Sequence, residues 1–217
     1  ETSRTPRQLG YLTVLIALGS LAIVAVWRDR AMEFDPALAA ALAAAFFATR
    51  LLTIRLPQGD DVYVTLVVGL VALAVADITV AVAASALAGA VESIARFSQS
   101  SRPVAVSRAL DAARATAVLA LMAPWQLVLR APLDAAARGD SLIMWLLMAG
   151  MVYSGLDILT MAVQQRLAGG LPVAQGIATL QRPLVTMYLV HLAMAAVAVR
   201  LYAGSGAWAF PIALLLT

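Results

Sequence analysis

VYVTLVVGLVALAVADITVAVAASALAGAVESIA, residues 62–95, is the stretch that decides the fold of this chain. It is apolar almost throughout, with one carboxylate, Asp77, near its middle and a second, Glu92, near its end. A single bilayer crossing needs about 20 residues, so this run is too long for one span. Asp77 divides it into 62–76 and 78–95. We expect the chain to reverse direction at Asp77, with 62–76 either crossing the bilayer or re-entering it.

Composition excludes a soluble globular domain. Hydrophobic residues make up 63% of the chain and charged residues only 12%, and the mean hydropathy is +0.90. The charges gather between apolar runs, as expected when lipid is the solvent. The arginines are scattered among loops rather than clustered on one face, so the basic balance does not indicate a nucleic-acid partner. The sequence therefore predicts one all-α domain over 1–217, a polytopic transmembrane helical bundle of six to eight spans in a lipid bilayer.

The expected spans follow from the apolar runs. Pro36 suits the first turn of the second helix. Residues 164–183 are too polar and glycine-rich to span, and they predict a short interfacial helix with Val173, Ile177 and Leu180 on its apolar side. The last run stops after about 11 residues, so we expect the biological chain to continue. The expected spans are 9–27, 37–54, 62–76, 78–95, 104–129, 141–163, 184–202 and an incomplete 207–217.

Orientation follows from the arginines. If 62–95 makes two crossings, most arginines share one side of the bilayer, and the positive-inside rule makes that side cytoplasmic together with the N-terminus. A single crossing removes this bias. The arginines on the shared side would be Arg4, Arg7, Arg50, Arg55, Arg96, Arg102, Arg108, Arg166 and Arg182, against Arg28, Arg30, Arg130, Arg138 and Arg200 on the other.

Three charged residues inside expected spans form the first candidate site. An ionisable residue at the bilayer centre costs about 2.5–3.5 kcal/mol on insertion scales, so each such residue is expected to have a structural or functional role that offsets this cost. Asp111 and Arg114 are three residues apart and share one helix face. Asp157 lies at a similar depth in another span. We expect Asp111, Arg114 and Asp157 to form a buried polar cluster, serving either as an ion pair that fixes helix register or as a ligand or proton site.

Two further residues rank second. Asp77 either caps the helix that follows it or contacts a substrate or cation. His191, the only histidine, is expected to be hydrogen-bonded inside the bundle rather than to bind a metal. Glu92 is expected to be solvated or paired with Arg96, and Arg50 to reach the headgroups. The chain has no Cys and no HExxH or His pair, so the sequence predicts no metal site and no cofactor.

Small residues recur every fourth position in the second half of the opening stretch. Ala81, Ser85 and Gly89 have the spacing that lets membrane helices approach closely. We expect this face to pack against another helix, and a homodimer through it is one possibility. GxSxG and Walker motifs are absent and the loops are short, so the sequence does not indicate an enzyme.

The order of these features resembles a known family. RLP-G (residues 55–59) is followed by the double apolar stretch, an Arg-Pro loop, RALDAARA (108–115) and YSGLDILTMAV (153–163). Residues 35–217 thereby resemble the N-terminal membrane domain of bacterial signalling proteins with an HD-GYP, GGDEF or histidine-kinase output. That domain in turn is similar to the S component of energy-coupling-factor transporters. The pattern usually carries Asn where this sequence has Asp111 and Asp157, which makes a partnership with Arg114 more necessary.

The resemblance implies a sensory domain in the bacterial cytoplasmic membrane. In this role the domain binds a small molecule or lipid, or senses the state of the membrane, and relays this to a cytoplasmic output domain absent from the chain. One alternative is a binding subunit of a vitamin-type transporter, which needs an ATP-driven partner. The other is a structural membrane subunit with no ligand.

Overall fold

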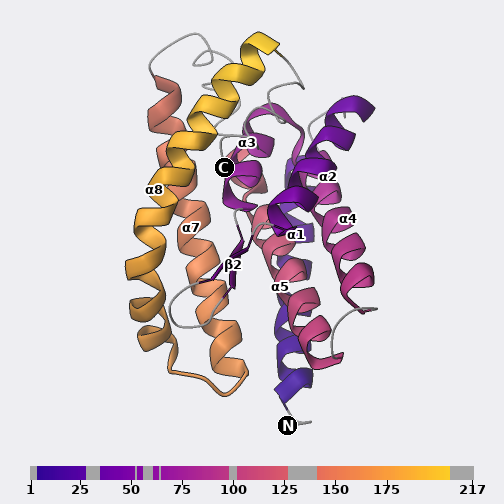
Figure 1. The fold of residues 1–217 in the computed structure, drawn as a ribbon, viewed down its shortest axis with the longest axis vertical. Coiled ribbons are helices and arrows are strands. Elements are labelled where there is room, and N and C mark those ends of the chain that lie inside the picture. Colours follow the sequence, from indigo (N-terminus) through magenta and orange to yellow (C-terminus); the bar gives the residue numbers. More distant parts are fainter. Residues whose placement is uncertain are drawn as a thin grey trace.

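The chain folds into a bundle of helices, shown in a computed structural model that describes residues 4–27, 35–51, 53–55, 61–63, 65–97, 102–126 and 141–205 (Figure 1). The expected span at 207–217 lies outside these residues. The elements are α1 (Arg4–Trp27), α2 (Pro36–Leu51), β1 (Thr53–Arg55), β2 (Asp61–Tyr63), α3 (Thr65–Val75), α4 (Ile78–Phe97), α5 (Arg102–Leu121), α7 (Ser141–Leu167) and α8 (Val173–Ser205). The predicted helical fold class is confirmed.

Several helices have the length and composition expected of membrane spans. Within the described part of the chain, three stretches are long and apolar enough to cross a bilayer, namely Pro6–Val26, Ile78–Ala95 and Met144–Leu167. Two shorter apolar helices cover Pro36–Leu51 and Tyr188–Leu201. These helices are those of a membrane protein. The total of six to eight spans stays a prediction.

Large apolar side chains cover much of the outer surface of the bundle. They come from α1, α4, α7 and α8, and a soluble protein of this size rarely leaves so many in contact with water. In a bilayer the same side chains would face lipid, which matches the three spans. Examples more than half exposed are Leu21 and Val24 on α1, Leu87 and Ile94 on α4 (58% and 72%), Met144 and Met151 on α7, and Leu189 and Val190 on α8.

The opening stretch is broken where Asp77 predicts a break. α3 ends at Val75 and α4 begins at Ile78, so 62–95 is not one continuous rod. α3 packs against α8, α2 and α7, whereas α4 packs against α2 and α5. With 11 residues α3 is only about 16 Å long, shorter than a hydrocarbon core of about 30 Å. It is almost fully buried in the bundle, with Leu70 and Ala72 at 0% exposure.

A buried glutamine hydrogen-bonds to the backbone on both sides of this break. The Gln126 Oε1 atom accepts a hydrogen bond from the Ile78 backbone N–H at 3.0 Å. Its Nε2 atom donates to the carbonyls of Ala76 at 2.5 Å and Leu73 at 3.4 Å. One side chain thus satisfies backbone groups at the end of α3 and the start of α4, which an apolar interior would otherwise leave unpaired. The predicted span 104–129 is correspondingly interrupted, since α5 ends at Leu121 and a helical turn at 123–126 presents Gln126.

The segment before α3 turns back within the bundle. α2 begins at Pro36, as predicted, and Asp35 caps it by accepting from the N–H groups of Ala37 and Leu38. β1 and β2 then pair antiparallel, with Ile54 opposite Val62. Figure 1 draws this hairpin near mid-height of the bundle. The all-α prediction omitted it.

The expected interfacial helix and the span after it are one element. α8 runs through residues 173–205 without interruption and passes Pro183, where the sequence predicts a boundary. Leu180 is buried, and Ile177 packs against the core. The connection from α7 is a tight turn in which Gly169 adopts a φ of 87° and the Gly170 N–H donates to the Gln165 carbonyl. This is a Schellman motif, and it folds α8 back along α7.

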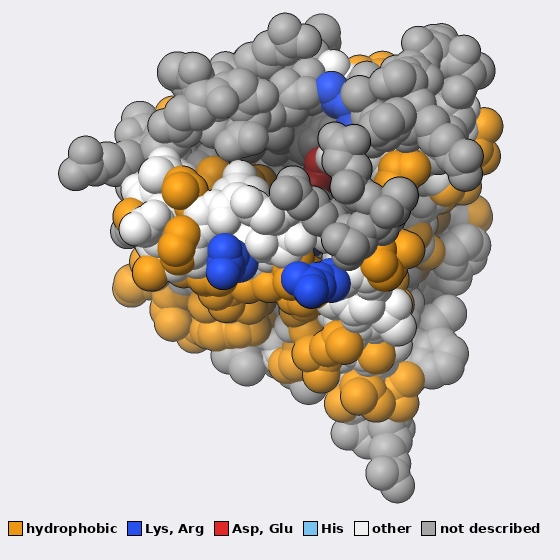
Figure 2. All heavy atoms as spheres, turned by 90° about the horizontal axis from the view of Figure 1, so that it is seen from below, with side chains coloured by type: hydrophobic (Ala, Val, Ile, Leu, Met, Phe, Trp, Pro, Cys, Tyr) orange, Lys and Arg blue, Asp and Glu red, His pale blue; other side chains and the backbone are white. Residues whose placement is uncertain are grey.

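Three chain segments meet at one end of the bundle. The start of α1, the end of α4 with the start of α5, and the turn from α7 to α8 all lie toward the bottom of Figure 1. Arg7 and Arg166 belong to these segments and are exposed. Figure 2 views this end and shows basic side chains beside a broad hydrophobic surface. The grouping agrees with the shared side expected for these two arginines, while its identity as the cytoplasmic side stays a prediction.

Candidate functional site

An ion pair between α5 and α7 forms the centre of the site. The Arg114 Nη1 atom donates to Asp157 Oδ1 at 2.5 Å, to the Asp157 carbonyl at 3.2 Å and to Thr160 Oγ1 at 3.1 Å. Arg114 is buried, with 4% of its surface exposed. A buried guanidinium needs both an opposite charge and hydrogen-bond acceptors, and α7 supplies both.

The same carboxylate also holds α8. The Tyr188 hydroxyl donates to Asp157 Oδ2 at 3.1 Å, so the two carboxylate oxygens of Asp157 bond to two different helices. On the other side, the Tyr11 hydroxyl of α1 donates to the Thr160 carbonyl at 3.4 Å. The polar contacts around Asp157 thereby join α1, α5, α7 and α8.

Asp111 lies one helical turn before Arg114 and has its own partner. Its Oδ1 atom accepts a hydrogen bond from Gln164 Nε2 at 2.7 Å. The structure therefore pairs Arg114 with Asp157 directly and ties Asp111 to the same helix, α7, through Gln164. The three predicted residues lie together between α5 and α7, and they combine two acidic groups with one basic group.

A second buried ion pair joins α2 to α4. Arg50 Nη1 lies 3.8 Å from Glu92 Oε2, and both residues are almost completely buried. Arg50 Nη2 also donates to the Ala112 carbonyl of α5 at 3.5 Å. The expectations that Arg50 reaches the headgroups and that Glu92 is solvated are wrong. α2 and α4 lie side by side, and their packing brings together two charges far apart in the sequence.

Asp77 and His191 have separate positions. The Asp77 Oδ1 atom accepts from the Thr79 N–H at 2.9 Å and from the Thr79 hydroxyl at 2.7 Å, so Asp77 is the N-cap of α4. His191 is buried at 4% exposure on α8, one turn after Tyr188, and its Nδ1 atom has no hydrogen-bond partner among the described residues. No group of His, Asp or Glu in that part of the chain is arranged to hold a metal ion.

The predicted small-residue face packs inside the chain. Ala81, Ser85 and Gly89 are buried. Ser85 Oγ lies 3.0 Å from Thr116 Oγ1 of α5, and a Cβ atom built on Gly89 would lie 3.1 Å from the Cβ of Ala112. α5 therefore covers the face that suggested a homodimer.

A cavity of about 340 Å³ lies between α7 and α8, next to the ion pair. The Ser154 side chain lines it; this residue is 8% exposed and its hydroxyl has no hydrogen-bond partner among the described residues. Tyr188, which bonds to Asp157, is also part of the wall. The remaining wall is Gly155 together with the apolar side chains of Met151, Ile158, Leu159, Ile177, Leu189 and Leu192. An apolar chamber with a few polar groups is the usual form of a small-molecule site.

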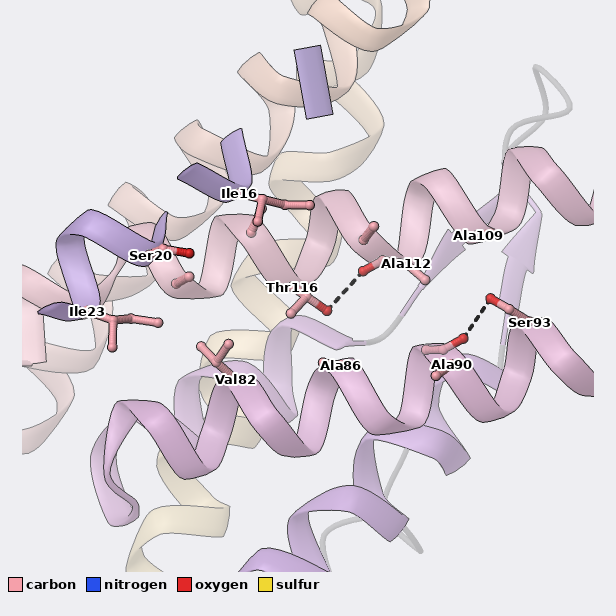
Figure 3. Close-up of a pocket in the computed structure, with 14 residues that line it drawn as sticks. Ile16, Ser20, Ile23, Val82, Ala86, Ala90, Ser93, Ala109, Ala112 and Thr116 are labelled. Atoms are coloured by element: carbon pink, nitrogen blue, oxygen red, sulfur yellow. Dashed lines mark hydrogen bonds between the residues drawn. The ribbon is translucent and has the colours of Figure 1, made fainter. Parts of the chain in front are cut away.

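A larger groove of about 450 Å³ lies between α1, α4 and α5. Figure 3 shows its walls of small and apolar side chains, such as Ile16, Val82 and Ala86. Two of its hydroxyls are engaged within their own helices, because Thr116 Oγ1 donates to the Ala112 carbonyl and Ser93 Oγ to the Gly89 carbonyl (Figure 3). The described residues give this groove no buried polar atom without a partner, so the α7–α8 cavity is the better candidate site.

Sequence reasoning missed the residues that make the cluster a site. Ser154 and Tyr188 were not selected, although Ser154 precedes Asp157 by one helical turn within YSGLD. A polar residue one turn from a buried acid on an apolar helix is a usable signal. Gln126 and the pair of Arg50 with Glu92 depend on contacts between distant segments, for which the sequence has no local pattern.

Comparison with protein families, with curated proteins and with solved structures finds no match to this chain.

Proposed function

We propose that this chain is a membrane-embedded sensory domain that binds a small molecule between α7 and α8. The observation that carries the proposal is the double role of Tyr188. Its side chain lines the α7–α8 cavity, and its hydroxyl bonds to the partly buried Asp157 carboxylate. A molecule that enters the cavity must contact the residue through which α8 is held to the charged cluster.

The relay follows from this contact. Displacement of Tyr188 weakens one of the two side-chain bonds of Asp157 and leaves the other, to Arg114, in place. α8 then shifts against α7, while α7 stays bound to α5. A shift of about 1–2 Å is typical of helices in signalling transitions. In the proposed role, α8 passes this movement to an output domain that follows it in the full-length protein.

A filled cavity can be imitated without a ligand. Gly155 is part of the cavity wall, and a Cβ atom built on it meets no heavy atom within 4 Å, so Gly155→Trp adds an indole at the wall without a clash at Cβ. Because the chain has no Cys, spin labels at Met144→Cys on α7 and Val197→Cys on α8 report the distance between the two helices by pulsed electron resonance in nanodiscs.

We expect Gly155→Trp to change the distance between these labels by about 1–2 Å. Gly10→Trp is the matched control, since Gly10 lies on α1 and its Cβ position also has no neighbour within 4 Å. The control should leave the distance unchanged. An unchanged distance in Gly155→Trp would overturn the proposed relay.

A further inference from the structure

We infer that the α7–α8 cavity takes a neutral, mainly apolar molecule with one hydroxyl or carbonyl group, and that this molecule enters sideways from the lipid at Gly155. The inference rests on the proposed function and deepens it by naming the class of ligand. It depends on the chemistry of the cavity wall, on Ser154 and on the exposure of the cavity rim.

The wall of the cavity excludes a charged ligand. None of the described residues that line it is charged. Arg114 and Asp157 lie behind Tyr188 and are bonded to each other. A carboxylate or ammonium group in this chamber would lose its hydration and find no counter-charge, which is costly in an apolar interior. The ligand is therefore neutral.

Ser154 specifies one polar group on the ligand. Ser154 is more than nine-tenths buried and is part of the cavity wall, and its hydroxyl has no hydrogen-bond partner among the described residues. A buried hydroxyl without a partner is costly until an acceptor or donor reaches it. The rest of the wall that the structure describes is apolar apart from Tyr188, whose hydroxyl donates to Asp157. One hydroxyl or carbonyl on an apolar body matches this wall.

The rim of the cavity opens on the apolar outer surface. Met151 and Leu159 of α7 and Leu189 of α8 line the cavity and are 64%, 45% and 58% exposed. Gly155 lies between Met151 and Leu159 on the same helix face, is exposed, and has open space where a side chain would project. This face belongs to the span Met144–Leu167. The opening at Gly155 thus leads to the hydrocarbon of the bilayer, where neutral amphiphiles dissolve.

The test uses 1-decanol carrying a diazirine, photolysed with the purified chain in nanodiscs and mapped by peptide mass spectrometry. We expect labelling of α7 and α8 around residues 151–159 and 189–192. Unlabelled 1-decanol should compete at roughly tenfold lower concentration than decane, decanoate or decylammonium, since one hydrogen bond to a buried group is worth about a factor of ten. Ser154→Ala should bring the preference for 1-decanol over decane below about threefold while the labelled peptides stay the same.

Blocking the cavity distinguishes an error in the ligand class from a failure of the proposed function. Gly155→Leu should reduce labelling at least tenfold, while Gly10→Leu leaves it unchanged, and both variants should melt at the wild-type temperature or above because a Cβ atom at either position meets no heavy atom within 4 Å. If decanoate or decylammonium competes best, or if decane competes as well as 1-decanol, the ligand class is wrong and the cavity remains a binding site. If Gly155→Leu is labelled as strongly as wild type, the cavity is not the binding site, and the ligand class and the proposed function both fail.

Discussion

At the scale of single residues, the ion pair of Arg114 with Asp157 carries a stability prediction. Arg114→Met leaves the partly buried Asp157 carboxylate without its guanidinium partner, and we expect a loss of up to about 3–5 kcal/mol, the usual cost of breaking a fully buried pair. The double variant Arg114→Met/Asp157→Leu removes both charges, so we expect it to be more stable than the single variant by about 2 kcal/mol or more. Unfolding by sodium dodecyl sulfate in mixed micelles measures the free energies. Additive effects of the two substitutions would contradict the direct pairing.

The function of the pair is tested by the same variants. If Asp157 only fixes the packing of the helices, Arg114→Met/Asp157→Leu should still bind the diazirine probe. If Asp157 transmits the filling of the cavity to α8, the double variant should still insert into the membrane and bind the probe. In that background, however, Gly155→Trp should no longer change the distance between the labels on α7 and α8. Asp157→Leu alone leaves Arg114 unpaired, so failure of that single variant to fold would support the packing role.

Residue-level prediction succeeded where charge and spacing were both informative. Asp111, Arg114 and Asp157 were selected because charges in apolar helices require partners, and the structure places them together. Asp77 precedes an apolar helix, and its capping role follows from that position. For Glu92 the sequence predicts either solvation or a pair with Arg96 on the same helix, because a sequence displays local pairs and hides distant ones. In the structure Glu92 is buried and lies 3.8 Å from Arg50 on another helix, a contact that the sequence does not indicate.

At the scale of helices, close packing of α1 on α5 gives a second prediction. A Cβ atom on Gly19 would lie 2.7 Å from the Cβ of Ala120, so Gly19→Ala must push α1 away from α5. We expect a loss of about 1–3 kcal/mol, as for overpacking in a core. Gly10→Ala on the same helix meets open space and should stabilise the protein by about 0.5–1 kcal/mol through helix propensity. The mixed-micelle unfolding assay compares both. Equal effects would show that α1 does not pack at Gly19.

Helix boundaries were predictable only where local chemistry decides them. Asp35 with Pro36 and the break at Asp77 appear in the sequence as caps, and the structure has both. Pro183 and the polar residues around it predict a boundary inside α8, but the helix is continuous, with Leu180 in the core and α8 packed along α7. Proline within a helix loses one hydrogen bond, and neighbouring helices compensate for this in membrane proteins.

At the scale of the whole molecule, orientation in the membrane gives a third prediction. The chain has no native Cys, so single-Cys variants report accessibility without background. Ala174→Cys lies near the turn from α7 to α8, at the same end as Arg7, and is exposed. We expect it to react with an impermeant maleimide only from the cytoplasmic side, whereas Met151→Cys should stay unreactive from both sides because lipid covers it. Reaction of Ala174→Cys in intact cells would reverse the assigned orientation.

The length of α8 has a mechanical consequence. Its 33 residues make a rod of about 50 Å, well beyond a hydrocarbon core of about 30 Å. Tyr188 lies near the midpoint of that rod, so in the proposed relay the loss of its bond to Asp157 would let α8 tilt about its middle. A rotation of roughly 10° about the middle would move Val173, about 22 Å away, through about 4 Å. The displacement would then be larger at the two ends of α8 than beside the cavity.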